Sequence, residues 1–340
     1  MYANTTYIFD PRGNADMDTG SHVLFGATLA GFAMTDPALS SRPELLPFVL
    51  SALVVCSHAP DFDTIVRLKS KGAYVRWHRG ITHAVPAWPL WPLVGALPFA
   101  ALPGVDASVA WHMYAWCLAA VAFHVALDAL NGYGVQLLRP FSRKWVHLDV
   151  LTIWDPFLFA LHLGTFAGWA AGAWSPNPAF LLLYGATFAY IGFRMWRHRR
   201  RVRALRESLR PVGVCYVMPC LHWWKWSFVA ELEDRYVSGF IRYGRIEDVS
   251  ELEKGGPAES DPLVEASRQS ESARAFLAFA SRVHVTVGET GDGYVVRFRD
   301  MRFRYGQTMP FGADVTLDRA RRVVRDRIGW SKKAWEGPYV

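Results

Sequence analysis

The sequence predicts a mostly α-helical fold: a multi-pass transmembrane bundle followed by a small C-terminal β or α+β domain in the cytoplasm. Three stretches, 80–105, 107–127 and 156–193, contain no Asp, Glu, Lys or Arg. Because a helix needs about 20 apolar residues to cross a bilayer, such stretches are candidate membrane spans. Charges become dense and nearly balanced after residue 210. We therefore expect a membrane-embedded, metal-binding helical domain over residues 17–200 and a soluble accessory domain over residues 211–340.

The membrane half contains six apolar segments, of which the first two are short for complete spans. They are 22–34, 45–57, 84–105, 109–130, 157–174 and 179–196. The turn Ser175-Pro176-Asn177-Pro178 separates the last two, since a proline disfavours helical backbone in the residue before it.

Basic residues predict the orientation of these segments, because Lys and Arg collect in cytoplasmic loops. The run 194–201 after the last segment is strongly basic, and counting back places the basic loops 131–156 and 58–83 on the same side. The loops on the opposite side contain only Arg42 among Lys and Arg. We therefore expect both termini and the C-terminal domain in the cytoplasm.

Composition argues against several other classes of protein. The net charge is +7, but the excess lies beside the apolar segments, which indicates topology control, and we expect no nucleic-acid partner. The four cysteines have neither a disulfide-framework nor a zinc-ribbon spacing. The first 16 residues lack the apolar core of a cleavable signal peptide.

Histidines and aspartates gather at the predicted cytoplasmic helix ends in three motifs. These are His58-Ala59-Pro60-Asp61-Phe62-Asp63, His78-Arg79-Gly80-Ile81-Thr82-His83 and His124-Val125-Ala126-Leu127-Asp128. The first offers two carboxylates for one or two ions, the second offers two imidazoles, and the third places both groups on one helical face. Imidazole with carboxylate suits zinc or another divalent ion. Such groups are costly near a bilayer unless they are paired or bind metal.

Each motif alone also has an ordinary structural explanation. An HxxxD pair is often a local hydrogen bond, and an Asp-x-Asp after proline can cap a helix. His112 and His162 face the other side or lie deeper, and we interpret them as structural or interfacial. The joint occurrence of the motifs on one predicted side favours a metal site.

At these residues the chain resembles the YdjM-like inner-membrane proteins, a family classed as metal-dependent hydrolases and associated by name with LexA. The resemblance covers about residues 17–160. It rests on Pro60-Asp61-Phe62-Asp63 of the first motif, without His58, and on the second and third motifs. Ser21-His22, Asn131-Gly132-Tyr133-Gly134 and Leu138-Arg139-Pro140 also belong to it. It implies an inner-membrane location and a helical fold distantly similar to zinc-dependent phospholipase C.

The same resemblance implies a set of candidate metal ligands. They are His22, Asp61, Asp63, His78, His83, His124 and Asp128. The downstream sequence lacks the ligands that a three-zinc enzyme needs, so we expect one or two divalent ions, zinc first.

Our first functional hypothesis is hydrolysis of a phosphoester or lipid-linked substrate at the cytoplasmic face through a metal-activated water. Asp61 or Asp63 would accept the proton of that water. Arg79 would hold an anionic phosphate, or it is simply a cytoplasmic positive charge. The alternative is a non-catalytic membrane protein with a structural or sensory metal cluster. The expected partners are membrane lipids and a small-molecule or lipid substrate, and a homo-oligomer is left open.

Alternating residues predict strands in the C-terminal domain. Residues 283–287 and 294–300 flank Gly291-Asp292-Gly293 as a hairpin. Residues 226–233, 236–243 and 302–305 are further candidate strands, whereas 250–272 is polar and predicts a loop that leads into a helix within 262–281. No catalytic motif is present here, which favours an accessory role.

Overall fold

The computed structural model describes residues 14–209, 213–254, 260–304 and 308–330. Contacts divide the chain into two compact units, Ser21–Lys254 and Gly255–Val340 together with Met1–Gly20. Helix gives way to strand close to the predicted boundary at residue 210, but the four strands that follow belong to the same unit as the helices.

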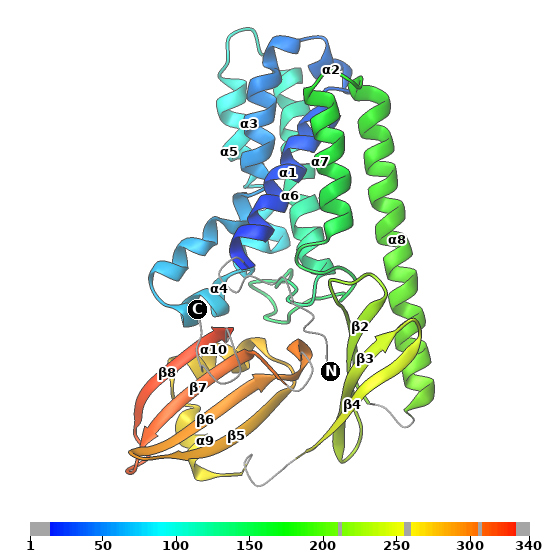
Figure 1. Cartoon of the computed structure of the whole chain (residues 1–340). Helices are drawn as coiled ribbons and strands as arrows, with labels where there is room; N and C mark the ends of the chain where they lie inside the picture. Colours follow the sequence, from blue (N-terminus) through cyan, green and yellow to red (C-terminus); the bar gives the residue numbers. More distant parts are fainter. Residues whose placement is uncertain (1–13, 210–212, 255–259, 305–307, 331–340) are drawn as a thin grey trace. The chain divides into compact units, whose positions relative to one another are not determined.

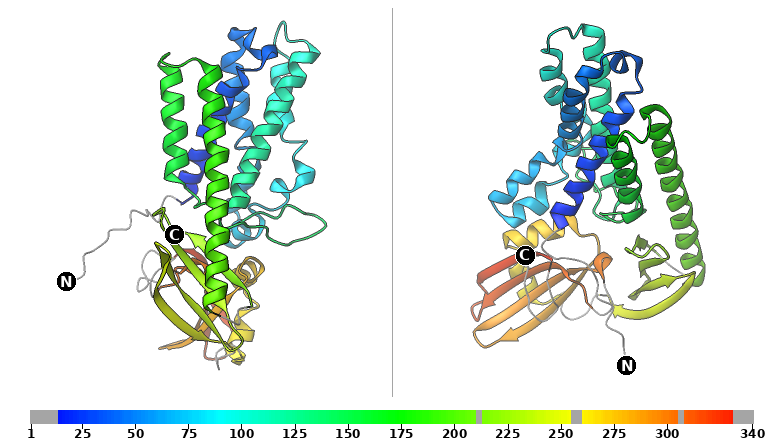
Figure 2. Two further views of the ribbon diagram at one scale, coloured as in Figure 1. Left: turned by 90° about the vertical axis from the view of Figure 1, so that its right-hand side faces the viewer. Right: turned by 45° about the horizontal axis from the view of Figure 1, so that its top comes forward.

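The helices of the larger unit, the longer of which lie side by side (Figures 1 and 2), fall between residues 14 and 208. They are α1 (Asn14–Ala33), α2 (Pro37–Ser40), α3 (Leu46–Cys56), α4 (Lys71–Trp77), α5 (Pro92–Ala100), α6 (Ala107–Leu130), α7 (Pro156–Ala170) and α8 (Pro176–Ser208). The buried core between them includes Leu53 of α3, Met113 of α6 and Phe180 of α8.

Two of the described helices, α6 and α8, are long and apolar enough to cross a membrane, and counting the bent pair Pro43–Cys56 and Ala59–Leu68 as one span makes three. The predicted segment 84–105 is broken, because a short 3₁₀ turn, Val85–Ala87, precedes α5 and α5 itself contains Pro98. The six-span topology stays a prediction.

Aspartate side chains define where two of these helices begin. Asp106 accepts hydrogen bonds from the backbone N–H groups of Ser108 and Val109 at the start of α6. Asp155 caps α7 in the same way. Such caps satisfy amide groups that have no partner inside the helix. With its start fixed, α6 carries residues 124 and 128 in its last two turns.

A four-stranded antiparallel sheet follows α8 in the same unit. Its strands, in spatial order, are β1 (Cys215–Pro219), β2 (Lys225–Glu231), β3 (Arg235–Arg242) and β4 (Arg245–Glu253). Trp226 and Phe228 bury their rings against Leu205 of α8. The strands predicted at 226–233 and 236–243 are confirmed. The loop predicted from residue 250 is wrong at its start, because β4 continues to Glu253 by pairing with β3.

The smaller unit combines two short helices with a second antiparallel sheet. These are α9 (Pro262–Ser267), α10 (Glu271–Phe279), β5 (Val283–Thr290), β6 (Gly293–Asp300), β7 (Phe311–Asp318) and β8 (Val323–Trp330). The predicted hairpin is confirmed as β5 and β6. The helix predicted within 262–281 is two helices. The Ser270 side chain accepts a hydrogen bond from the backbone N–H of Ala273 and so caps a new helix that begins at Glu271.

The strand predicted at 302–305 is wrong over its described residues. Met301–Phe303 forms a 3₁₀ turn, and Tyr305 lies outside the described residues. The Asp300 carboxylate accepts hydrogen bonds from the backbone N–H and the guanidinium of Arg302. This buried pair closes the turn and ends the extended backbone of β6.

Close packing of α1 against α3 gives the first test. A Cβ added to Gly26 would lie 2.8 Å from Val54 Cα and 2.9 Å from Leu53 O. Because both are backbone atoms, we expect Gly26→Ala to lower the free energy of unfolding by about 1–3 kcal/mol, measured by thermal or SDS denaturation. Gly192→Ala is the matched control, since its Cβ would meet nothing within 4 Å. Equal stability of the two variants would contradict the packing of α1 on α3.

Candidate metal centre

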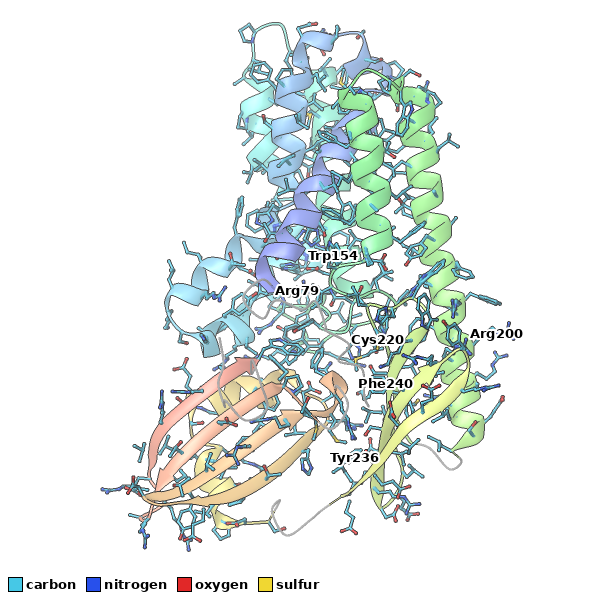
Figure 3. The ribbon with its side chains drawn as sticks, viewed as in Figure 1. Arg79, Trp154, Arg200, Cys220, Tyr236 and Phe240 are labelled. Atoms are coloured by element: carbon cyan, nitrogen blue, oxygen red, sulfur yellow. The ribbon has the colours of Figure 1, made fainter. Side chains whose placement is uncertain are left out.

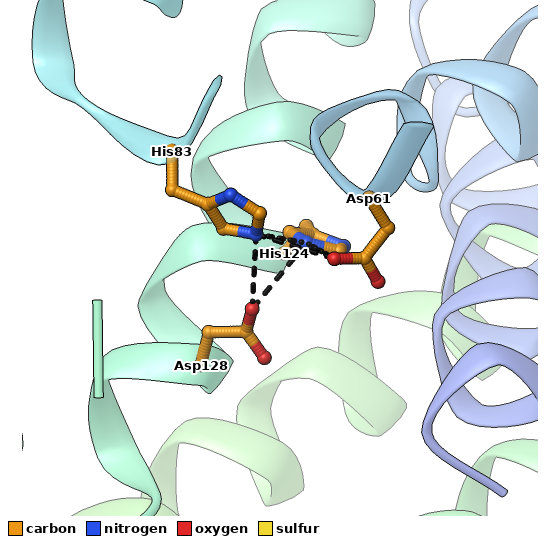
Figure 4. A group of neighbouring side chains, drawn as sticks. All are labelled: Asp61, His83, His124 and Asp128. Atoms are coloured by element: carbon orange, nitrogen blue, oxygen red, sulfur yellow. Dashed lines mark hydrogen bonds and ion pairs between the residues drawn. The ribbon is translucent and has the colours of Figure 1, made fainter. Parts of the chain in front are cut away.

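Four buried side chains from three segments converge at one end of α6. Asp61 lies in the 3₁₀ helix Ala59–Leu68, His83 in the 3₁₀ turn Ile81–His83, and His124 and Asp128 lie one turn apart on α6. One ligand atom from each residue lies within 4.8 Å of the others (Figure 4). We call these four residues the inner quartet. All are at most 4% exposed.

Local structure explains how His83 reaches α6. A Cβ on Gly80 would lie 2.6 Å from Trp77 O, so the chain turns tightly after α4 only with glycine there. Two indole groups then hold the segment: Trp88 Nε1 donates to His83 O at 3.1 Å, and Trp91 Nε1 donates to Thr82 O at 2.8 Å. The ring of His83 is thereby fixed beside Asp128.

The Nε2 atoms of the quartet point inward. His83 Nε2 lies 3.3 Å from Asp61 Oδ1, 3.2 Å from Asp128 Oδ2 and 3.2 Å from His124 Nε2. His124 Nε2 is 3.6 Å from Asp61 Oδ1. Imidazole nitrogens and carboxylate oxygens therefore surround one common point.

The Nδ1 atoms of the same imidazoles point outward to partners that fix their tautomer. Ser57 O can only accept, so His124 Nδ1, at 2.7 Å, carries a proton and donates it. Asp63 Oδ2 accepts from the Thr82 hydroxyl, so Thr82 Oγ1 in turn accepts from His83 Nδ1 at 3.0 Å. In the neutral imidazoles both Nε2 atoms therefore present lone pairs to the centre.

Carboxylate oxygens that face the centre consequently have few hydrogen-bond donors. Asp61 Oδ1 and Asp128 Oδ2 are buried and accept no hydrogen bond of regular geometry from the described part of the chain. Burial disfavours the charged form of His83, but Asp128 and Asp61 outweigh burial and raise the pKa of His83 to about 9. The carboxylates of Asp61 and Asp128 therefore favour positive charge at this point, which either a proton on His83 or a bound cation supplies.

A second group shares Asp61 with the quartet. Its members are Asp61, Asp63 and His78, and their ligand atoms also lie within 4.8 Å of one another. His78 Nδ1 lies 2.7 Å from Asp63 Oδ1, and His78 Nε2 lies 4.0 Å from Asp61 Oδ1. The side chain of His78 is 14% exposed, so this group lies nearer to solvent than the quartet.

The seventh predicted ligand, His22 of α1, borders the quartet. Its Nε2 lies 3.5 Å from Asp128 Oδ1, and its ring centroid lies 3.9 Å from that of His124. The structure thus brings all seven predicted ligands into one connected cluster. Their role in binding metal stays a prediction.

Arg79 has contacts that the sequence did not indicate. Its Nη2 lies 2.9 Å from Asp128 Oδ1, and its Nη1 donates to Asn131 Oδ1 at 3.2 Å. The guanidinium is buried and neutralises a carboxylate of the quartet. The predicted phosphate contact would have to compete with this ion pair.

Sequence reasoning missed three supporting residues. Thr82 lies inside the second motif and could have been found as a polar group between two histidines. Asn131 directly follows α6, where Asn commonly ends a helix. Ser57 acts through its backbone carbonyl, which leaves no side-chain signal.

His162 binds Thr28 and Thr187 inside the bundle, as expected for a structural histidine.

Two family models match this chain. The model of the YdjM inner membrane protein family matches residues 17–201, which include every member of the cluster. The chain belongs to this family. The YdjM match extends beyond the predicted 17–160 and includes both candidate spans, α6 and most of α8. The model of the YfhP C-terminal alpha/beta plait domain matches residues 262–336.

A full-length relative shares both parts. The protein named "Uncharacterized protein YfhP" of Bacillus subtilis (strain 168) is 34% identical over 316 residues, which cover 92% of this chain and 95% of that protein. No solved structure matches. The YdjM part and the C-terminal part therefore occur together in that relative.

The Arg79–Asp128 pair gives the second test. Removing one partner of a buried ion pair leaves an uncompensated charge and costs about 3–5 kcal/mol. We expect Arg79→Gln to lower the free energy of unfolding by about that amount in chelator-treated protein. Arg76→Gln, at an exposed arginine of α4, should change it by no more than about 0.5 kcal/mol. Equal stability would show that Arg79 does not neutralise Asp128.

Proposed function

We propose that this chain is a metal-dependent hydrolase at the cytoplasmic face of the inner membrane, with its ion held by Asp61, His83, His124 and Asp128. One observation carries the proposal: the quartet turns its hydrogen-bond donors outward and its acceptors inward. Two imidazole nitrogens and two carboxylates are a donor set that zinc accepts. The outward partners of Nδ1 are those that orient metal-binding histidines in proteins.

The chemistry of the proposal is simple. A bound divalent ion would polarise a phosphoryl or carbonyl oxygen and make water acidic near neutral pH. The chain's own residues must then position that water and take its proton. Of the two predicted proton acceptors, Asp61 faces the centre, whereas Asp63 binds His78 Nδ1, the Thr82 hydroxyl and the backbone N–H of Arg79.

These contacts support a different role for Asp63. Because a carboxylate only accepts, His78 Nδ1 carries the proton of their 2.7 Å hydrogen bond, and His78 Nε2 is left to take a proton. An imidazole oriented by a carboxylate is a common general base. If one ion binds, His78, oriented by Asp63, would accept the proton of the water. If two ions bind, His78 and Asp61 would instead be ligands of the second ion.

The surroundings of the second motif favour an anionic substrate such as a phosphoester or a lipid-linked phosphate. Arg76 and Arg139 both place their guanidinium groups near the Trp77 ring, at 5.5 and 5.4 Å from its centroid. Trp77 is 44% exposed and directly precedes His78. Arginine and tryptophan together suit the headgroup level of a bilayer. Arg76 and Arg139, unlike Arg79, are free of carboxylate partners among the described residues.

The six-helix, multi-pass topology with cytoplasmic termini belongs to the same proposal. The basic loops, the helix ends that carry the cluster, and α6 and α8 as candidate spans all support it. The burial of the quartet supports an alternative, a structural or sensory metal cluster, because a substrate must reach an ion that these side chains enclose.

Metal content and turnover test this function together. We expect purified protein, never exposed to chelator, to contain one or two divalent ions per chain by elemental analysis and to hydrolyse a phosphomonoester or phosphodiester. His83→Ala and Asp128→Asn should lose the metal and the activity. His112→Ala is the matched control, since His112 binds Asp36 outside the cluster.

The outcomes separate the two candidates. Metal without turnover on the phosphoester panels would favour the structural or sensory cluster. Protein free of metal, or equal activity in all variants, would contradict the hydrolase.

The Thr82 relay gives a separate prediction about metal affinity. Thr82→Val keeps the shape of the side chain but cannot accept from His83 Nδ1 or donate to Asp63. Loss of such an outer partner typically costs 10- to 100-fold in metal affinity, so we expect about that loss for Thr82→Val in a competitive zinc titration. Thr82→Ser, which retains the hydroxyl, should bind nearly as wild type. Equal affinity of the Val and Ser variants would show that the relay does not orient His83.

A further inference from the structure

Helix α8 continues without a break from its apolar part into an arginine-rich part. Seven arginines lie in its last turns, and the only acidic residue of the helix is Glu207. The arginines are Arg194, Arg197, Arg199, Arg200, Arg201, Arg203 and Arg206. To orient a helix in the membrane, positive charge near its cytoplasmic end is enough, and the arginines need no particular arrangement.

One of these arginines is part of the core. Arg194 is buried, donates to Val150 O and Trp223 O, and lies 4.5 Å over the Trp226 ring. The other six make no ion pair with a carboxylate of the described residues. Their positive charge is therefore not balanced by this part of the protein.

Aromatic rings lie where the apolar and basic parts of α8 meet. Phe193 and Trp196 of α8 are at 5.8 Å between centroids, and Trp223 from the turn between β1 and β2 lies 6.0 Å from Phe193. Arg197 lies over Phe193 at 5.7 Å, and Arg200 over Trp196 at 5.0 Å. Arg200 projects from the outer side of α8 (Figure 3).

The sheet contributes two turns to the same region. Trp224, from the turn between β1 and β2, stacks on Tyr243, from the turn between β3 and β4, at 5.7 Å. A Cβ on Gly244 would lie 3.0 Å from Arg201 Nη1, so this turn touches α8. Tyr243 is 70% exposed although its ring is large and mostly apolar.

A hollow of about 430 Å³ lies on another side of the same helix. Three arginines line it, Arg199, Arg203 and Arg206, against one acidic residue, Glu207; His198 and Val202 complete the lining. Each guanidinium group in this lining can donate two hydrogen bonds at once to the oxygens of a phosphate.

We propose that the basic part of α8 and the two aromatic turns form a binding surface for anionic phospholipid headgroups. Aromatic rings favour the interface of a bilayer, and arginines beside an anionic leaflet bind its phosphates. The surface is continuous with a helix that is apolar enough to span the membrane. Hydrogen bonds from Arg194 to Trp223 O and from His198 to Val217 O connect α8 to the sheet. Lipid bound to α8 would therefore hold β1–β4 beside the bilayer. This inference does not depend on metal or hydrolysis.

The test compares two lipids with the same acyl chains, phosphatidylglycerol and phosphatidylcholine, on full-length protein. Lipid retained by the detergent-purified protein is titrated by native mass spectrometry. Each arginine near an anionic surface contributes about fivefold to binding. We expect wild type to prefer phosphatidylglycerol and the double variant Arg200→Gln with Arg203→Gln to lose about 25-fold in its affinity.

The matched control removes the same charge from the smaller unit, as Arg319→Gln with Arg325→Gln. It should keep the wild-type preference. Equal retention of the two lipids by wild type would overturn the proposal. So would an equal loss of phosphatidylglycerol in the test and control variants, because it would reflect net charge alone. Metal content measured on the same samples reports on the other proposal separately.

Discussion

The crowding of acceptor atoms around one buried point constrains the rest of the larger unit. Lone pairs of His83 and His124 face the carboxylates of Asp61 and Asp128 at 3.2 to 3.6 Å. Such an arrangement costs free energy unless a proton on an imidazole or a bound cation supplies positive charge at the centre, because like partial charges repel strongly where water is excluded. Each segment that carries a member must therefore be held in place by contacts outside the centre.

Those outer contacts come from ordinary backbone and aromatic groups. Ser57 O at the end of α3 holds His124, and indole groups hold the carbonyls of residues 82 and 83. The loop after α6 folds back on its end, since Leu148 and Val150 donate to Ala129 O and Leu130 O. Arg194 then bonds the same loop to α8 through Val150 O. Arg194 thus contacts both the turn before β2, at Trp223 O, and the loop that folds back on the end of α6, at Val150 O.

The sequence was sufficient to predict which residues form the cluster, but not the role of each residue in it. Motif spacing on α6 puts His124 and Asp128 on one face whatever the tertiary structure, and glycine and proline mark the turns that carry the other members. Whether a carboxylate binds an ion or orients an imidazole depends on which of its atoms face inward. Asp63 and Arg79 had the right chemistry for their predicted roles, but Thr82 and Asn131 decide where their side chains point.

Tertiary contacts that cannot be read from the sequence also explain the wrong predictions of secondary structure. Apolar and aromatic residues marked β2, β3, β5 and β6, and each of these strands buries some of them, among them Trp226, Val237, Val285 and Phe298. Strand β4 is mostly exposed and polar, and it forms by pairing with its neighbour rather than by burying a face. At 302–304 a buried ion pair overrode the alternation. Helix length was harder to predict, since prolines inside an apolar run shorten helices without changing its hydrophobicity.

Charge balance connects the number of ions to the function. Three carboxylates, Asp61, Asp63 and Asp128, lie in the cluster, and Arg79 neutralises one of them. With neutral imidazoles, one divalent ion compensates the remaining two charges and leaves a neutral, self-contained centre, as a structural or sensory cluster requires. A second ion beside His78 would leave an excess of two positive charges near the exposed edge. An anionic phosphate would balance that excess, so two ions are the state that would fit the proposed phosphoester hydrolase, with Asp61 shared between the two sites.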